Sequence, residues 1–527
     1  MKITRMKLKM MAIILAMLTA LSFVGCSAGY APKEDCYEEG INNMSGVMSP
    51  GEVADNIAAD RAEAEEIEKD EAVDQDEAVD QVIVENPFVS TATNNISTFS
   101  ADVDTASYAY FRKLVVSGYS YEDLANSGTA FRTEEFINYF KYNAPNPAEN
   151  ELFGVLSELT PCPWNEESYL LRLTLQAEEA VNTGSNNLVF LIDVSGSMSS
   201  ADKLPLLKKA FSYLVGNLGA DDTVSIVTYS GNEAVVLDGC SGMKTELIMS
   251  AINELKASGS TNGEAGLTMA YQIAEKHFKA DGNNRIIMAS DGDLNVGITS
   301  VGELEEYISN KRDQGIYLSV LGFGSGNYRD AKMETIADNG NGVYYYIDGE
   351  SEAEKVFGTD LLGTLYTVAE DVKLQLEFNP ERVDSYRLVG YENRVMANED
   401  FENDAKDAGE VGASHQVTVC YEIKLKEGGE AADKFITLRT RHKKPGESLS
   451  LLNEYEILES DISFEMSEDQ AFICAVVETC MLLRQSQHAG ELTLEDALYK
   501  LESLDLSNYP ERKEFRTLAE KLFKAYK

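Results

Sequence analysis

Alternation between strand-like and helix-like segments from Asn187 to about Ala369 constrains the fold of this chain more than any other feature of its sequence. The strand-like segments read, in order, "LVFLID", "TVSIVTY", "RIIMAS", "IYLSVLGFG" and "VYYYID". The first, third and fourth are almost wholly apolar, which is typical of central strands in a parallel sheet that is covered on both faces. We therefore predict an α/β fold with a doubly wound, mostly parallel, Rossmann-like sheet over residues 184–369.

Helical periodicity in the intervening segments supports this interpretation. One side of the first helical segment carries five apolar residues: Leu204, Leu207, Phe211, Leu214 and Leu218. The segment "GELEEYISNKRDQG" supplies another apolar stripe. Because such a stripe must be buried against another element, we expect these helices to cover the sheet.

Strands with a period of two flank the α/β segment on both sides. "LFGVLSEL" and "SYLLRLTLQ" precede it, and "VKLQLEF", "SYRLVGY", "HQVTVCYEIKL" and "FITLRTR" follow it. Because an isolated pair of strands is barely stable, we expect the two sets to pair into one β-rich domain into which the α/β unit is inserted. Residues 468–525 read as two or three helices, so residues 370–527 are predicted to be a β-rich and helical C-terminal domain.

Further elements are predicted ahead of the first flanking strands. Residues 97–119 read as a strand followed by an amphipathic helix, with Asp104 or Thr105 as its N-cap. The segment "RTEEFINYF", residues 132–140, reads as a second helix. Residues 87–183 are therefore expected to form an N-terminal region of their own.

The amino terminus has the pattern of a secretory signal. Basic residues from Lys2 to Lys9 precede the stretch "MMAIILAMLTALSFV", which is short for a membrane span but suits the apolar part of a signal peptide. The following "FVGC" resembles a bacterial lipobox, in which Cys26 would be lipidated. We expect residues 1–25 to be a lipoprotein signal peptide, and the rest to lie outside the cytoplasm, lipid-anchored to the cell membrane or envelope. Simple secretion and an uncleaved anchor are the alternatives.

Residues 26–86 read as an acidic, disordered tether, with a short helix as the alternative. The segment is rich in carboxylates, and it repeats the hexapeptide "DEAVDQ" over residues 70–81. It cannot bury enough apolar surface to offset the entropy of ordering. The whole chain has 89 acidic and 45 basic residues and a net charge of -44. This excess argues against nucleic acid as a partner, because phosphate backbones are held by basic patches.

The cysteines that follow Cys26 do not form a recognisable metal or disulfide framework. They are Cys36, Cys162, Cys240, Cys420, Cys474 and Cys480. No C-x-x-C pair occurs among them, so metal-thiolate sites are not expected. An extracytoplasmic compartment would permit disulfides, but the spacing does not demand them, and we expect buried free thiols.

Oxygen-bearing side chains follow the strands of the predicted parallel sheet. Asp193, Ser195 and Ser197 come directly after its first strand, Thr261 stands at the start of a helix, and Asp291 follows "RIIMAS". In an open α/β sheet, ligands bind in the crevice beyond the carboxyl ends of the strands. An all-oxygen set with no nitrogen or sulfur suits a hard cation such as Mg²⁺. Serines and aspartates in such turns also serve as helix caps, which is the purely structural alternative.

The stretch "DVSGSM" matches the D-x-S-x-S motif of von Willebrand factor type A domains. Thr261 and Asp291 stand where that family has its later metal-site threonine and aspartate. The resemblance implies a metal-ion-dependent adhesion site holding Mg²⁺, or Mn²⁺ or Ca²⁺. It implies that Ser195, Ser197 and sometimes Thr261 touch the cation directly, that Asp193 and Asp291 act largely through water, and that an acidic residue of a protein ligand completes the coordination.

The likeness extends over roughly residues 86–525. "STFSADVDTASYA", "EEFINYF", "PCPWN", "KLPLLKKA", "ASDGDLNVG" and "EFNPERVDSYRLVGYENR" together resemble a bacterial lipoprotein family. That family carries a von Willebrand factor type A domain between a characteristic N-terminal region and a C-terminal domain of unknown function. The resemblance adds no counterpart for the acidic tether.

These features predict a binding module and not an enzyme. The leading hypothesis is a membrane-tethered lipoprotein that binds a protein or a carboxylate-bearing ligand through a divalent cation. An envelope assembly or scaffold protein, with an internal acid at a structural metal site, is the alternative. A hydrolase ranks third, because a serine nucleophile would need a histidine base. None of the histidines has a placement that suggests a base: His277, His415, His442 and His488.

Overall fold

The computed structural model describes most of the chain after residue 82. The described residues are 83–149, 151–179, 184–231, 233–260, 263–292, 301–324, 330–360, 363, 365–426, 434–461 and 464–524. The predicted signal peptide, Cys26, Cys36, most of the predicted tether and Thr261 lie outside these residues.

A six-stranded sheet forms the centre of the inserted unit, with the strand order β10-β9-β8-β5-β6-β7. Its strands are β5 (Asn186–Asp193), β6 (Thr223–Tyr229), β7 (Ala234–Ser241), β8 (Asn283–Ser290), β9 (Tyr317–Phe323) and β10 (Tyr344–Ile347). All neighbours are parallel except the antiparallel pair of β6 and β7. The predicted doubly wound α/β fold is therefore confirmed. The edge strand β7 was not predicted, because most of its side chains are exposed or half-buried and it lacks an apolar run.

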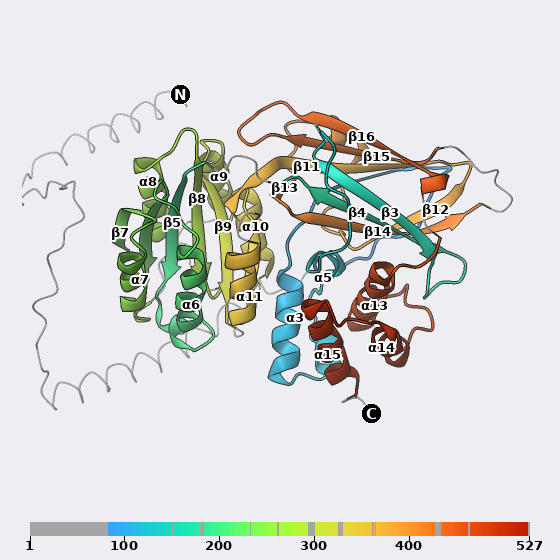
Figure 1. Ribbon diagram of the computed structural model, residues 1–527, viewed down its shortest axis with the longest axis horizontal. Coiled ribbons are helices and arrows are strands. Elements are labelled where there is room, and N and C mark those ends of the chain that lie inside the picture. The colour runs from blue at the N-terminus through green and yellow to red at the C-terminus, as the bar shows by residue number, and fades with distance from the viewer. Residues whose placement is uncertain are drawn as a thin grey trace, which may run out of the picture. The chain divides into compact units, whose positions relative to one another are not determined.

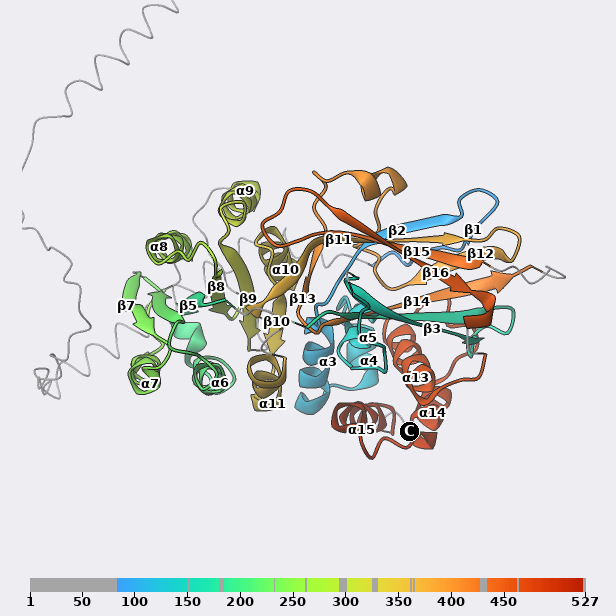
Figure 2. The ribbon, with the colours of Figure 1, turned by 45° about the horizontal axis from the view of Figure 1, so that its top comes forward.

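Helices cover both faces of this sheet (Figure 2). They are α6 (Leu204–Val215), α7 (Thr245–Glu254), α8 (Gly263–Lys276), α9 (Val301–Arg312), α10 (Asp330–Asn339) and α11 (Glu350–Glu354), which continues into the turn η2 (Lys355–Thr359). Helices α6, α7 and α11 pack into one core cluster and α8, α9 and α10 into another, on opposite faces. All five residues of the predicted stripe are buried, although α6 ends before the last of them, Leu218.

Two antiparallel sheets form the β-rich domain. The first has the order β1-β12-β14-β4-β3, and the second β13-β11-β15-β16, with β2 also paired to β11. Their strands are β1 (Val89–Ser90), β2 (Ile96–Ser100), β3 (Phe153–Pro161), β4 (Tyr169–Ala177), β11 (Thr367–Phe378), β12 (Val383–Val389), β13 (Gly409–Gly412), β14 (Gln416–Leu425), β15 (Lys434–Lys443) and β16 (Leu451–Leu458). Strand β4 pairs with β14 from Gln176–Gln416 to Tyr169–Ile423, so strands from both sides of the α/β unit share one sheet, as predicted.

Helices from both ends of the described chain share one core beside this β-rich domain (Figure 1). They are α3 (Ala106–Ser117), α4 (Tyr121–Ala125), α5 (Thr133–Asn138), α13 (Glu468–Leu483), α14 (Leu494–Ser503) and α15 (Pro510–Lys524); the short turns η3 (Asn398–Glu402) and η4 (Glu459–Asp461) lie outside it. Aromatic rings fill the core, with Phe140 packed edge-on against Phe472 at 4.9 Å.

Along the described stretches, no helix combines the length and the apolar character that crossing a membrane would require.

Of the two residues predicted to cap α3, Thr105 stands at the N-cap position, but the capping hydrogen bond of its side chain is not formed. Asp104 accepts a hydrogen bond from the backbone N–H of Tyr344 on β10 at 3.1 Å. A local cap would need a partner two or three residues further along the chain. Asp104 instead links the N-terminal region to the edge of the α/β sheet.

Buried ion pairs join the α/β unit to its flanking regions. Arg112 on α3 contacts Asp348 at 2.5 Å and Glu352 at 2.6 Å. Arg394, after β12, contacts Glu334 on α10 at 2.7 Å, and Arg132 pairs with the same carboxylate. Removing one partner of such a pair leaves an uncompensated buried charge, so these contacts resist separation of the α/β unit from its flanks.

Candidate metal site

The carboxyl ends of β5 and β8 place two aspartates at one edge of the parallel sheet. Ile192 on β5 pairs in register with Ala289 on β8. Asp193 is the last residue of β5 and is fully buried, and Asp291 lies two residues beyond Ala289 and is 6% exposed. Both carboxylates therefore lie where the crevice of an open α/β sheet forms.

The loop after β5 arranges two serine hydroxyls beside Asp193. Asp193 Oδ1 accepts the backbone N–H of Ser195 at 2.8 Å. The Oγ atoms of Ser195 and Ser197 lie 2.9 Å apart, at the start of the turn η1 (Gly196–Ser199). The N–H of Gly196 donates to the carbonyl oxygen of Gly259 at 3.0 Å, which ties this loop to the segment that precedes α8.

Burial raises the pKa of Asp193 to about 6, and the nearby charge of Asp291 adds to the rise. Hydrogen bonds from Ser195 oppose it. Asp193 Oδ2 is buried and makes no hydrogen bond of ordinary geometry within the described part of the chain. A buried carboxylate oxygen without a partner is costly, and a cation next to it would remove that cost.

Lys203 is a residue of this site that sequence reasoning missed. Its Nζ donates to Asp291 Oδ2 at 2.8 Å, and the two side chains are 16% and 3% exposed. Lys203 immediately precedes α6, and its side chain passes Gly324, the residue that follows β9. The two available signals were a lone lysine before the helix in "DKLPLL" and the glycine of "GFGSGN". Neither one indicates a contact with Asp291 by itself.

The assembled groups fit a hard divalent cation. Asp193, Asp291, Ser195 and Ser197 offer only oxygen atoms, which are the ligands that Mg²⁺, Mn²⁺ and Ca²⁺ accept. Of the predicted set, these four are brought together, whereas Thr261 lies outside the described residues. No group of three or more His, Cys, Asp or Glu side chains suited to a metal occurs in the described ranges, so the hydroxyls would be needed to complete the coordination.

The histidines have partners or surroundings that do not involve the serines. His277 Nε2 lies 2.6 Å from Asp238 Oδ1 on β7. Burial lowers the pKa of His415 to about 3 and that of His442 to about 4. Among the residues that the structure covers, no histidine hydrogen-bonds to Ser195 or Ser197. The five described cysteines are buried, and none of them forms a disulfide with another described cysteine, in line with the expectation of buried thiols.

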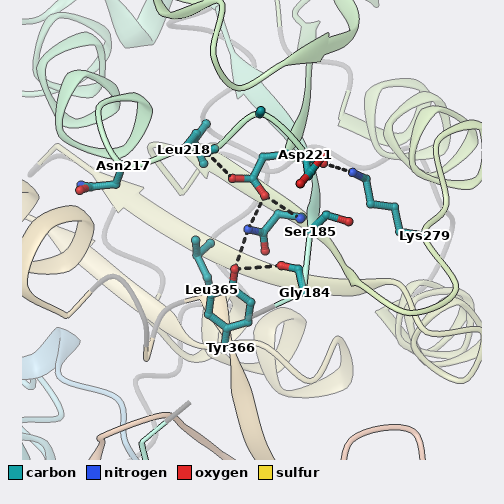
Figure 3. Close-up of a pocket in the computed structure, with 12 residues that line it drawn as sticks. Gly184, Ser185, Asn217, Leu218, Asp221, Lys279, Leu365 and Tyr366 are labelled. Carbon is teal, nitrogen blue, oxygen red and sulfur yellow. Dashed lines mark hydrogen bonds between the residues drawn. The ribbon is translucent and has the colours of Figure 1, made fainter. Parts of the chain in front are cut away.

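A polar cavity of about 650 Å³ lies at the opposite, amino-terminal edge of the sheet (Figure 3). Asn186 donates through Nδ2 to Tyr366 Oη at 2.7 Å and to Asp222 Oδ1 at 2.9 Å. Asn186 begins β5 and Tyr366 immediately precedes β11, so these bonds tie together the two connections between the α/β unit and the β-rich domain. The side chains of Asn186, Asp222 and Tyr366 in this cavity therefore hold those connections.

Family models match successive parts of the chain. A model described as "von Willebrand factor type A domain" matches residues 187–359, and one described as "Uncharacterized protein YfbK, C-terminal" matches residues 363–524. A third, described as "von Willebrand factor", matches residues 74–172.

Similar proteins come from bacteria and animals. The chain is 43% identical over 359 residues to the "Uncharacterized protein YfbK" of Escherichia coli K12, which covers 66% of this chain and 62% of that protein. It is 27% identical over 199 residues to sll0103 of Synechocystis, covering 37% of this chain and 45% of that one. It is 31% identical over 157 residues to the inter-alpha-trypsin inhibitor heavy chain H4 of Sus scrofa, covering 28% and 17%. The matches span less than two thirds of each of these relatives.

Two solved structures align with most of the chain. A von Willebrand factor type A protein from Catenulispora acidiphila gives a TM-score of 0.41 at 16% identity, covering 73% of this chain and 89% of that one. The ArnB paralog VWA2 from Sulfolobus acidocaldarius gives 0.36 at 16% identity, covering 71% and 98%. From the family-model matches and the identity to YfbK, this chain belongs to the bacterial family of proteins that contain a von Willebrand factor type A domain, here followed by a YfbK-type C-terminal region.

Proposed function

We propose that this protein is an extracytoplasmic, membrane-tethered lipoprotein that binds a protein or another carboxylate-bearing ligand through a divalent cation. The observation that carries the proposal is the buried Oδ2 of Asp193, which has no hydrogen bond of ordinary geometry among the described residues and adjoins the loop that holds the paired hydroxyls of Ser195 and Ser197. Domains of this family typically mediate protein–protein interaction and commonly bind a divalent metal, and their homologues are generally not enzymes.

In this proposal the cation supplies a Lewis-acidic position at the crevice that a partner's carboxylate can occupy. Ser195 and Ser197, with Thr261, would hold it through hydroxyl oxygens. Asp193 and Asp291 would balance its charge, largely through water. The hydrogen bond from the Ser195 N–H to Asp193 Oδ1 fixes the start of the loop relative to the carboxylate. Asp193 would therefore also help to orient the hydroxyls of Ser195 and Ser197. The fixed loop lowers the entropy that binding would otherwise cost.

The location outside the cytoplasm rests on the sequence pattern around Cys26. A lipid on this residue would attach the chain to a membrane, and the acidic segment up to residue 86 would separate the folded part from that surface. The binding site would then face other proteins of the envelope.

A capture experiment tests the ligand-binding proposal. The full chain is immobilised and exposed to envelope extracts in Mg²⁺ or in EDTA, alongside an Asp193→Ala variant and a matched control, Asp313→Ala. Asp313 is 67% exposed at the end of α9, so its loss should change nothing. We expect partners that are retained in Mg²⁺ by the wild type and the control only. Retention of the same proteins in EDTA and by Asp193→Ala would reject a cation-mediated contact.

An envelope scaffold is the second candidate, and one observation favours it. Lys203 already gives Asp291 a positive partner, so part of the charge of the site is balanced from within the chain. In a scaffold the flanking domains would make the contacts, and the metal would only stabilise the fold. The same capture experiment separates the two: a scaffold would keep its partners in EDTA, although its unfolding temperature would still rise with Mg²⁺.

A further inference from the structure

Lys203 stands at the position where a cation would balance Asp291, and this inference therefore rests on the proposed metal function. The ammonium lies 2.8 Å from Asp291 Oδ2, and both side chains are largely buried. Such a charge-assisted hydrogen bond is among the stronger polar contacts in proteins. Asp291 is thus neutralised by a residue of its own domain.

The arm of Lys203 runs through a slot that is shaped for it. Gly324 has a φ of +85°, and a Cβ at that position would lie 2.3 Å from Lys203 Cε and 3.1 Å from its Cγ. Another residue at position 324 would be strained by this backbone conformation, and the lysine arm would have to shift to make room for its Cβ. The carbonyl oxygen of Gly324 accepts a hydrogen bond from the Tyr346 hydroxyl, which fixes the wall of the slot.

The backbone that carries Lys203 is anchored from outside the α/β unit. The preceding residue, Asp202, contacts Lys113 of α3 at 3.0 Å, and its other oxygen accepts the Ser200 hydroxyl at 2.6 Å. The loop is therefore held in place through both carboxylate oxygens of Asp202. A flexible four-carbon arm on a fixed backbone can swing its ammonium toward water without moving the loop.

We propose that Lys203 is a built-in competitor of the divalent cation at this site. Two positive charges next to one largely buried carboxylate repel each other, so a cation that enters beside Asp291 displaces the lysine ammonium. The ammonium keeps its proton and moves to solvent, while Asp291 exchanges one positive partner for another. Lys203 thereby sets the metal concentration at which the site fills, and it shields Asp291 from Asp193 when the cation is removed.

The first test measures Mg²⁺ affinity by titration calorimetry on the full chain. Lys203→Met keeps the apolar arm in the slot but removes the charge, so the cation no longer has to break a charge-assisted hydrogen bond. We expect its Kd for Mg²⁺ to be lower than that of the wild type by about tenfold. The matched control is Lys208→Met, on the helix α6 that Lys203 precedes. Within the described residues, Lys208 Nζ donates to the carbonyl oxygens of Asn253 and Leu255 and to no carboxylate, so the control should bind Mg²⁺ like the wild type.

The second test needs no variant and so does not depend on how Lys203→Met folds. Wild-type protein is acetylated briefly with and without Mg²⁺, and the modified lysines are mapped by mass spectrometry. Displacement predicts that Mg²⁺ increases acetylation of Lys203 severalfold and leaves Lys208 unchanged. An unchanged Kd in Lys203→Met, or unchanged acetylation of Lys203 in a wild type that binds Mg²⁺, would overturn this inference alone. If neither protein responds to Mg²⁺, the proposed metal function fails and the inference fails with it.

Discussion

Two neighbouring glutamates on α5 should respond in opposite ways to the loss of their charge. Glu134 and Glu135 are 0% and 1% exposed. Glu135 Oε2 accepts the backbone N–H of Ser107 at 2.7 Å, and its Oε1 lies 3.4 Å from a guanidinium nitrogen of Arg132. No side chain in the described part of the chain hydrogen-bonds to Glu134, which lies against the backbone at Gly390. The two residues therefore differ in their partners and hardly in their burial.

Burial raises the pKa of Glu134 to about 7, and the charges of Glu392 and Asp102 add to the rise. The backbone N–H groups of Tyr391 and of Glu134 itself oppose it. Because the folded state binds this proton more tightly than the unfolded state, the contribution of Glu134 to stability is fully present below pH 4.5. It is lost as the pH rises to about 7. A rise of this size corresponds to a penalty of about 3 kcal/mol above pH 7.

Glu134→Gln should remove that penalty, because the amide is neutral at every pH and has nearly the same shape. At pH 8 we expect the free energy of unfolding to increase by up to about 3 kcal/mol, and at pH 4 we expect no change. Glu135→Gln should instead lower it at pH 8 by roughly 1.5 to 3 kcal/mol, because a charged acceptor is lost at Ser107 and Arg132.

Urea unfolding of the full chain at several pH values between 4 and 8 decides the matter. Trp164, the only tryptophan, is 8% exposed and packs into the same aromatic core, so its fluorescence reports this transition. If Glu134→Gln destabilises the protein at pH 8 as Glu135→Gln does, Glu134 has a partner that the geometry does not reveal. A gain that persists unchanged at pH 4 would refute the role of the charge.

In calorimetric melts, Mg²⁺ at about 100 times its Kd should stabilise the wild type by roughly 2.7 kcal/mol. Asp291→Asn should abolish this gain in stability, and Ser195→Ala should weaken it. Equal gains in all three proteins would mean that these residues are only helix caps and turns. Cys26→Ser should leave the protein unprocessed or released from the membrane in cell fractionation, and processing and retention like the wild type would contradict the lipid anchor. Residues 187–369 expressed alone should give a cooperative thermal transition, whereas residues 370–460 alone should not, because β14 would lack β4. A cooperative transition of the second fragment would contradict the inserted arrangement.

Much of the fold follows from short-range patterns, because the period of the apolar residues reports which faces are buried. The apolar runs of β5, β8 and β9 and the stripe on α6 are sufficient to predict a covered parallel sheet. Strand β7 was not predicted, because an edge strand with exposed side chains lacks a run of apolar residues in the sequence. Asp104 was misassigned because its partner, the N–H of Tyr344, lies 240 residues away in the sequence. Capping rules consider only hydrogen-bond partners that are close in the sequence, so they cannot identify a partner this far along the chain.

The same limit applies to the candidate site. Strand ends are predictable, and so is the meeting of Asp193 and Asp291 at one edge. The charge balance there is not predictable, because it depends on how Lys203, Gly324 and a flanking helix fold around the crevice. From the sequence alone, two neighbouring carboxylates would require a bound cation to balance their charge. In the folded chain, the ammonium group of Lys203 already provides a positive charge beside Asp291.

The inserted arrangement explains how a flanking helix can reach this crevice. Both connections to the β-rich domain leave from the amino-terminal edge of the sheet, at Asn186 and Tyr366, so they do not cover the opposite edge, where Asp193 lies. Helix α3 nevertheless contacts the loop beside that edge through Lys113 and Asp202, and its next residue inward, Arg112, is held by Asp348 beyond β10. A movement of the loop away from α3 would have to break only the partly exposed pair of Lys113 and Asp202, whereas a movement that carries α3 along would also have to break the buried pair of Arg112 and Asp348. Because the buried pair is the costlier to break, we expect α3 to stay in place and any movement of the loop to break its contact with Lys113. The candidate site is therefore coupled to the N-terminal region through this one ion pair.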